Sequence, residues 1–384
     1  MTTDKHNKRP NVPPLRFPEF TEPWETAKLG AIAEFSKGTG ISKEQRSETG
    51  LPCILYGELY TTYTNEVIEE VGSKTDLDPT DLVKSQKNDV IIPSSGETAE
   101  DIATARCVTS DNVLLGGDLN IIRLVEPNDG RFMSYQLNGI RKYDIAKIAQ
   151  GVSVVHLYGG DLKMLSVTFP QSPEQKKIAD CISLLDRRIS VQIGLIEDLQ
   201  KLKAALCNTI FSSMKTKIVK VGELAEVYQP RTISQRELME NARYLVYGAN
   251  GIIGKYHNYN HEESQVCITC RGNTCGAVCF TQPQSWITGN AMVINVDKVQ
   301  DKLSKKFLYY YLCGYNFTPI ISGSGQPQIV RKPIEDIWLP LPTLKEQIFI
   351  VKKIDAIENK LQIENKLVDL FSKQKQYLLQ QMFI

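Results

Sequence analysis

The sequence of 384 residues lacks a long hydrophobic run. No stretch approaches the roughly 20 apolar residues that a membrane-spanning helix needs, which argues against a membrane protein. The segment from Met1 to Pro14 is polar and lacks the apolar centre of a signal peptide. We therefore expect a cytoplasmic protein in which residues 1–14 form a disordered lead-in. Without a secretory signal, the nine cysteines are expected to be reduced thiols.

The chain also has little net charge and few histidines. A formal charge of +1 neither supports nor excludes a nucleic-acid partner, because only the local distribution of Lys and Arg decides that. The four histidines fall in no metal-binding or nucleophile pattern. The stretch Gly251–Tyr256 hints at a phosphate loop, but Ala249 occupies the first glycine position and Tyr256 the position of the magnesium-binding Ser or Thr. We predict no catalytic residue and no cofactor.

Four cysteines lie close together in the sequence, and a zinc site would need their thiolates to converge tetrahedrally. However, the segment is typical of a hairpin, with strands Val266–Thr269 and Gly276–Phe280. The matching positions of an earlier segment carry Ile91 and Ser94, so the architecture does not require cysteine. We interpret the four as small buried hydrophobic residues and predict no metal site. They are Cys267, Cys270, Cys275 and Cys279.

A long internal repeat is the main feature that the chain does contain. Pro170 and Glu174-Gln175 open one apolar-periodic segment, and Pro342 and Glu346-Gln347 open another 172 residues later. Upstream, Lys28–Phe35 resembles Lys220–Val227, Tyr56-Gly57 is similar to Tyr247-Gly248, and Val90–Gly96 matches Val266–Gly272. A repeat of this length indicates two copies of a domain followed by a helix.

Apolar residues alternate at spacings of four and three along both segments, which predicts a coiled-coil seam. The first seam comprises Ile178, Ile182, Leu185, Ile189, Gln192, Ile196, Leu199, Lys203, Leu206 and Ile210. The second comprises Ile350, Ile354, Ile357, Leu361, Glu364, Val368, Phe371, Lys375, Leu378 and Met382. An antiparallel pairing can place Gln192 opposite Lys375 and Lys203 opposite Glu364, and such polar pairs select register at some cost in stability. The alternative is that these four residues are merely tolerated on an imperfect seam.

The fold class that follows is α+β, with two similar mixed α/β domains separated by two long helices in an antiparallel coiled coil, a pseudo-two-fold repeat. Gly and Asn turns between short apolar runs indicate strands within each domain. We place the first domain at residues 15–172, the first helix at 173–214, the second domain at 215–342 and the second helix at 343–384.

Both domains carry basic, aromatic and amide residues in glycine-punctuated loops. Arg and Lys can bind phosphate or guanine, and Asn and Gln can bind adenine through two hydrogen bonds, whereas many loop polar groups are simply solvated. The candidates of the first domain are Lys37, Lys43, Arg46, Tyr60, Tyr63, Ser94, Ser95, Arg106, Lys147, Gln150 and His156. Those of the second are Arg231, Tyr247, Asn250, Lys255, Tyr256, Arg271, Asn273, Gln326 and Gln328.

This arrangement resembles the specificity subunit of type I restriction-modification systems over nearly the whole chain, from Leu15 onward. The most specific matches are the two helix openings with Pro and Glu-Gln. The run Gly323–Ile329 and the opening Trp24-Glu25 with Lys28-Leu29-Gly30 also match. The first domain departs from the family's glycine-glutamine run, with Gln150–His156 in its place, but keeps Gly151 in register with Gly323.

The resemblance implies two target-recognition domains, each contacting one half of a split, asymmetric site in double-stranded DNA. The helices would set the spacing and dock two methyltransferase subunits, which restriction subunits would join. This subunit would itself be non-catalytic and would not bind S-adenosylmethionine. The alternatives are a two-headed ligand-binding or enzymatic protein with a coiled-coil linker, and a purely structural scaffold. Loops that diverge on a common framework argue against the scaffold.

Overall fold

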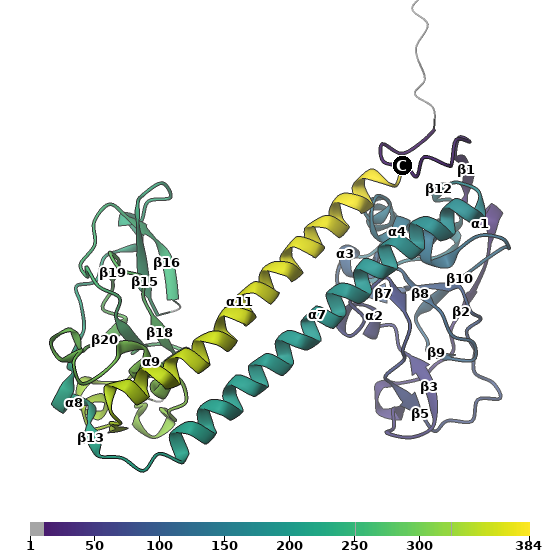
Figure 1. Ribbon diagram of the computed structural model, residues 1–384. Helices are drawn as coiled ribbons and strands as arrows, with labels where there is room; N and C mark the ends of the chain where they lie inside the picture. Colours follow the sequence, from purple (N-terminus) through teal and green to yellow (C-terminus); the bar gives the residue numbers. More distant parts are fainter. Residues whose placement is uncertain (1–10, 250, 324) are drawn as a thin grey trace, which may run out of the picture. The chain divides into compact units, whose positions relative to one another are not determined.

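The structure is a computed structural model that describes residues 11–249, 251–323 and 325–384. It divides into two compact units, Met1–Ile193 with Leu367–Ile384, and Gly194–Lys366. Each unit holds one globular domain and one part of each of two long helices, α7 (Ser172–Ser212) and α11 (Leu344–Gln381) (Figure 1). The prediction of two mixed α/β domains with two long helices is confirmed.

The first domain is built on a five-stranded sheet. Its strand order is β2 (Ala33–Lys37), β10 (Leu119–Leu124), β6 (Asp89–Pro93), β8 (Arg106–Val108) and β4 (Val67–Ile68). Smaller sheets pair β1 (Glu25–Lys28) with β12 (Ser166–Phe169), β7 (Ser95–Gly96) with β11 (Val155–His156), and β3 (Leu51–Ile54) with β5 (Lys74–Thr75) and β9 (Leu114–Leu115). The helices are α1 (Leu29–Ile32), α2 (Glu58–Thr61), α3 (Ala99–Ile102), α4 (Gly130–Asn138), α5 (Lys142–Ile148) and α6 (Gly159–Lys163).

The second domain repeats this plan with fewer elements. Its main sheet has the order β14 (Glu226–Tyr228), β20 (Ala291–Asn295), β17 (Val266–Thr269) and β18 (Val278–Phe280). The smaller sheets are β13 (Ile218–Lys220) with β21 (Trp338–Pro340), and β16 (Gly251–Tyr256) with β15 (Tyr244–Gly248) and β19 (Trp286–Ile287). The helices are α8 (Val221–Leu224), α9 (Lys305–Cys313) and α10 (Arg331–Glu335).

The short helices α1 and α8 show why the repeat keeps a glycine at one position. A Cβ on Gly30 would lie 2.8 Å from the Cβ of Lys163 on α6, and a Cβ on Gly222 would lie 2.8 Å from the Cβ of Glu335 on α10. Glycine therefore allows each short helix to pack closely against the helix that precedes the last strand of its domain.

The Glu-Gln pair at each helix opening has a structural role, and its glutamine acts in the same way in both domains. The Gln175 carbonyl accepts the backbone N–H of Asp129, the N-cap of α4, at 2.9 Å, and its amide donates to the Pro170 carbonyl at 2.8 Å. In the second domain the Gln347 carbonyl accepts the backbone N–H of Ser304, the N-cap of α9, at 2.8 Å. The Gln347 amide donates to the carbonyls of Lys302 and Pro342. Each buried glutamine thus joins its long helix to the domain.

The glutamates differ between the two copies. Glu174 is buried and pairs with Arg16 at 2.7 Å, inside the first domain. Glu346 is exposed and accepts hydrogen bonds from the backbone and hydroxyl of Thr343, which closes the first turn of α11 as a capping box.

The seam residues on both helices are buried or half-buried at all twenty predicted positions, so the periodicity is confirmed. In the first unit Asp186 meets Lys375 and Arg188 lies over the Phe371 ring, so α7 and α11 run antiparallel there; in the second unit Lys203 meets Glu358.

The predicted polar pairing across the seam was wrong. Lys203 pairs with Glu358 rather than Glu364, and Lys375 pairs with Asp186 rather than Gln192. Glu364 forms an ion pair with Lys360 on its own helix. Lys375 also contacts Glu66 of the first domain at 2.5 Å, so two carboxylates surround one buried ammonium and raise its pKa, against the effect of burial. These partners lie off the seam, where apolar periodicity carries no information about them.

The lead-in prediction needs a correction for residues 11–14. Asn11 exchanges two hydrogen bonds with Trp24, each 2.7 Å long, one through its backbone carbonyl and one through its side-chain amide. These bonds hold the segment on the first domain. Residues 1–10 lie outside the described residues.

The far end of the chain completes the core of the first domain. Met382 and Phe383 are buried in the same cluster as Trp24 and Phe132, with the rings of Phe132 and Phe383 5.0 Å apart. The second domain has its own core around Phe307 and Leu308 of α9. In the described part of the chain, no helix is both long enough and apolar enough to cross a membrane.

Replacing Gln347 by Leu should destabilise the second domain by about 3 kcal/mol, because the Ser304 N–H and two carbonyls lose a buried partner at ~1–3 kcal/mol per unsatisfied group. Urea unfolding measures the loss, and hydrogen exchange should show α9 losing protection. The exposed neighbour Lys345 provides the control, since Lys345→Ala should change stability by less than about 0.5 kcal/mol. Equal effects of the two variants would contradict the role of Gln347.

Candidate nucleic-acid interface

A closed loop from Ser322 to Gln328 stands out in the second domain. The backbones of its two end residues exchange hydrogen bonds of 2.8 Å in both directions. Gly323 has φ +89°, and a Cβ there would collide with the carbonyl of Gln326, so the bend requires glycine. Gln326 and Gln328 are exposed on this loop.

The loop lies against the turn that follows β17. The Gly272 N–H donates to the Pro327 carbonyl at 3.0 Å, and the Ile329 N–H donates to the Cys270 carbonyl at 3.0 Å. Arg271 and Gln328 thereby become bridge partners, and both are exposed. Asn273 is exposed two residues further along the same turn. The structure therefore brings together candidates that are more than fifty residues apart in the sequence.

The end of the β15–β16 hairpin joins this group. The hydroxyls of Thr269 and Thr274 both donate to the carbonyl of Ala249, at 2.5 and 3.1 Å. Lys255 is exposed on β16. Asn250, also a candidate, lies outside the described residues.

A second group gathers around Trp286. Its indole N–H donates to the Arg231 carbonyl at 3.2 Å, and its ring lies 5.2 Å from that of Tyr256. Gln229, two residues before Arg231, donates its amide to the Cys270 sulfur and the Gly289 carbonyl at 3.1 Å each, so the segment that leads to Arg231 is bonded to the residue before Arg271. Guanidinium, aromatic and amide groups thus line one connected set of loops.

The first domain contains the same loop with different side chains. Gln150 and His156 exchange backbone hydrogen bonds of 2.8 and 2.7 Å, and His156 pairs with Ser95 between β11 and β7. Gly151 has φ +124°, and a Cβ there would meet the carbonyl of Val154. The predicted equivalence of Gly151 and Gly323 is confirmed.

The remaining exposed candidates of the first domain are more dispersed. Lys37 ends β2, Tyr60 lies on α2, and Lys147 lies on α5 with its ammonium 4.1 Å from the ring centre of Tyr143. Arg46 donates to the Lys43 carbonyl at 3.3 Å and pairs with Glu58 at 3.5 Å.

Four candidates turn out to support the fold instead. Arg106 is only 8% exposed and donates to the Tyr63 carbonyl at 3.1 and 2.9 Å; its burial lowers its pKa. Burial raises the pKa of the Tyr63 phenol to about 12. Ser94 is buried at the end of β6, where its carbonyl accepts the Leu157 N–H. Tyr247 packs in a core cluster, and its hydroxyl accepts the Gln282 N–H at 3.1 Å. We leave these four out of the proposed contact surface.

The sequence interpretation missed Trp286, Ile252 and Ile253. Nothing in the Ser285-Trp286-Ile287 run distinguishes a core tryptophan from one that organises a loop surface. The two isoleucines were considered only as part of an unsuitable phosphate loop.

The cysteine segment forms the expected hairpin, with Cys267 opposite Cys279 across β17 and β18. Cys267 and Cys270 are buried, whereas Cys275 and Cys279 are half-buried. Among the residues that the structure describes, no group of three or more His, Cys, Asp or Glu side chains could hold a metal ion.

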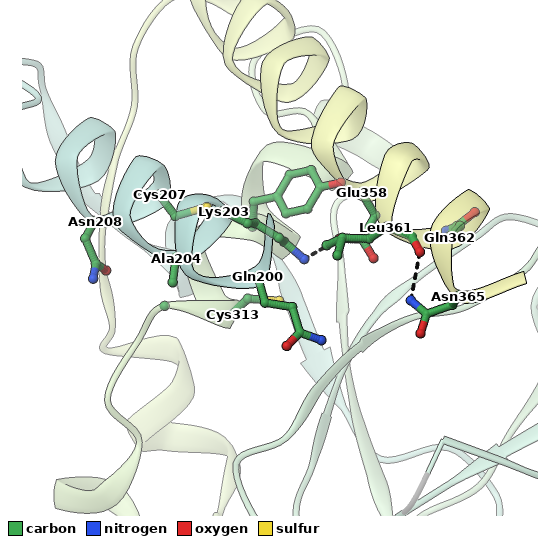
Figure 2. A pocket seen from close by; sticks show the side chains of 12 residues that line it. Gln200, Lys203, Ala204, Cys207, Asn208, Cys313, Glu358, Leu361, Gln362 and Asn365 are labelled. Carbon is green, nitrogen blue, oxygen red and sulfur yellow. Dashed lines mark hydrogen bonds and ion pairs between the residues drawn. The ribbon is translucent and has the colours of Figure 1, made fainter. Parts of the chain in front are cut away.

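A groove of about 600 Å³ lies in the second unit, between its parts of α7 and α11 and the end of α9. Figure 2 shows Lys203 of α7 directed at Glu358 of α11, its ion-pair partner, so the two charges neutralise each other across the groove. The remaining polar lining is mostly amide: Gln200, Asn208, Gln362 and Asn365. This lining offers hydrogen-bonding contact with another molecule rather than an arrangement for acid–base chemistry.

Comparison with known proteins identifies the family. The family described as "Type I restriction modification DNA specificity domain" matches residues 21–201 and again 214–369. The putative type I restriction enzyme MjaX specificity subunit of Methanocaldococcus jannaschii is 22% identical over 97% of this chain and 95% of its own. A putative type I restriction enzyme specificity subunit of Haemophilus influenzae is 31% identical over 114 residues, which is 29% of each chain.

The fold is also found in a solved structure. The crystal structure of the type I restriction-modification system S subunit from M. genitalium superposes with a TM-score of 0.71 at 18% identity, covering 97% of this chain and 99% of that chain.

Tyr247→Phe should lower stability by about 1 kcal/mol, because the hydroxyl that accepts the Gln282 N–H is removed from a buried site. DNA affinity of the assembled complex should not change. Thermal unfolding and a binding titration measure the two effects. Tyr244→Phe, on the same strand, is the matched control and should leave both unchanged. A tenfold loss of DNA affinity in Tyr247→Phe with unchanged stability would restore this residue to the contact surface.

Proposed function

This chain belongs to the type I restriction modification DNA specificity domain family, and we propose that its two domains each recognise one half of a split, asymmetric target in double-stranded DNA. On this proposal the chain is itself non-catalytic and binds no S-adenosylmethionine. Methylation and cleavage are carried out by methyltransferase and restriction subunits.

The observation that carries the proposal is that both domains close a loop by the same pair of backbone hydrogen bonds and a positive-φ glycine, with different side chains. In the second domain the loop places Gln328 beside Arg271, two residue types that hydrogen-bond adenine and guanine edges. In the first domain the equivalent bridge places His156 beside Ser95, with Val152 98% exposed on the loop. A common frame with different contact groups is suited to recognising two different half-sites.

The helices support the spacing part of the proposal. Their 41 and 38 residues correspond to about 60 Å at ~1.5 Å per residue, and rigid helices hold attached loops at a fixed separation. The net charge of +1 means that partner subunits would supply many phosphate contacts, so the isolated chain should bind DNA weakly and with strong salt dependence.

The helices also provide docking surfaces for two methyltransferase subunits. Large apolar side chains remain exposed on them, and such surfaces mark protein interfaces. In the first unit these include Leu184, Val191, Leu370 and Tyr377; in the second they include Leu202, Phe349 and Ile363. The amide-lined groove of Figure 2 adds hydrogen-bonding groups beside this surface in the second unit.

A two-headed ligand-binding or enzymatic protein is the second candidate, favoured only by the groove. DNA binding measured with and without co-purified methyltransferase separates the two functions. Methylome sequencing of a host that carries the complex reports the split motif directly.

Arg271→Ala or Gln328→Ala should remove base discrimination in one half-site and preserve it in the other. Each lost bidentate contact should reduce the penalty for a wrong base by about 1–3 kcal/mol. Competition titrations of the assembled complex, with single base changes in each half-site, measure this. Lys298→Ala, which removes a largely exposed charge in the same domain, is the control for a general electrostatic effect. Equal losses in both half-sites would contradict the proposal that each domain recognises one half-site.

Val191→Glu and Phe349→Glu should prevent co-purification of the methyltransferase, because a charge replaces side chains that are 73% and 59% exposed on the helices. Unfolding temperatures should be unchanged, since neither side chain contributes much to the core. Val152→Glu places the same charge on the exposed loop of the first domain and should leave assembly intact. Normal assembly of both helix variants would place the docking surface elsewhere.

A further inference from the structure

The β15–β16 hairpin contains an irregularity at its exposed end. Tyr247 pairs with Ile252 and Val246 pairs with Gly254, so Ile253 is an extra residue on β16. A bulge of this kind changes the direction of side chains that would otherwise alternate between the two faces of a sheet. Ile252 is 54% exposed and Ile253 is 43% exposed, so neither contributes its full surface to the core.

Two glycines shape this end of the hairpin. Ile253 lies over Gly248, where a Cβ would be 3.0 Å from the Ile253 Cδ1. A Cβ on Gly254 would be 3.0 Å from the Cδ1 of Leu238, whose neighbour Met239 donates its N–H to the Lys255 carbonyl at 2.9 Å. Leu238 thus covers the strand at Gly254, and the two isoleucines before it remain exposed.

The hairpin end that carries Ile252 and Ile253 is bonded to residues of the candidate interface. Through the carbonyl of Ala249, the hairpin end is bonded to Thr269 and Thr274, which flank the turn that carries Arg271 and Asn273. Lys255 is exposed on the same strand. A two-residue apolar patch among cationic and amide groups is small for a protein interface, but it matches a surface that is mostly polar with isolated methyl groups.

DNA presents such a surface in its major groove. The groove admits a two-stranded β-ribbon, and the C5-methyl of thymine is the apolar group among its base-edge donors and acceptors. We propose that Ile252 and Ile253 recognise thymine by contacting its methyl group in the half-site bound by the second domain. This inference rests on the proposed function, and it names one base that the domain selects.

The test replaces thymine by uracil, which removes only the methyl group. Once the split motif is known, each thymine of both half-sites is replaced singly by deoxyuridine, and the affinity of the assembled methyltransferase complex is measured. For the wild-type complex, at least one replacement in the second domain's half-site should weaken binding about three- to tenfold, in line with the loss of one buried methyl.

The Ile252→Ala/Ile253→Ala variant should bind the thymine and uracil sites equally, because the contact partner of the methyl is gone. Its unfolding temperature confirms that it is folded. Ile218→Ala is the matched control: Ile218 is 60% exposed on β13, which Figure 1 draws at the opposite end of this domain from β15 and β16. This variant should keep the full sensitivity to uracil.

Three outcomes would overturn the inference while leaving the proposed function in place: a half-site without thymine, a wild-type complex insensitive to uracil, or a double variant as sensitive as wild type. A wild-type complex without any sequence preference would instead remove the proposed function, and this inference with it.

Discussion

One buried glutamine side chain holds each domain to its long helix. Gln175 and Gln347 each bind the N-cap of a domain helix through the amide oxygen and the carbonyl of the preceding proline through the amide nitrogen. An amide can do both at once because it carries a donor and an acceptor at a fixed angle. The orientation of each domain on its own helix, and hence of its recognition loops, depends on this contact.

Much of the framework could be predicted because the helices and the two domains each correspond to a repeating pattern in the sequence. The four-three apolar spacing identified the two helices, and the repeated segments identified two domains of one plan. The helix register could not be obtained in the same way. A shift of about one heptad leaves the apolar seam matched, so apolar residues alone do not distinguish one register from the other. The ion pairs that Lys203 and Lys375 form are with Glu358 and Asp186, which lie outside the seam.

The candidate site was predicted less well, for a different reason. Polarity and a glycine-rich context marked Arg271 and Gln328, which are exposed and adjacent, but they equally marked Arg106 and Tyr247, which are buried. Burial depends on contacts with segments far away in the sequence, such as the Tyr63 carbonyl that binds Arg106. The exposed isoleucines on β16 were missed because only strand pairing reveals the extra residue.

The packing of Met382 and Phe383 against Trp24 and Phe132 has a consequence for biosynthesis. Domains generally fold in order of synthesis, with the N-terminal one first. Here the first domain is synthesised before Met382 and Phe383, so the place that they fill in its core is still empty. The second domain can therefore finish folding before the first domain does. The nascent chain must therefore keep that site from aggregating until Met382 and Phe383, which follow α11, have been synthesised.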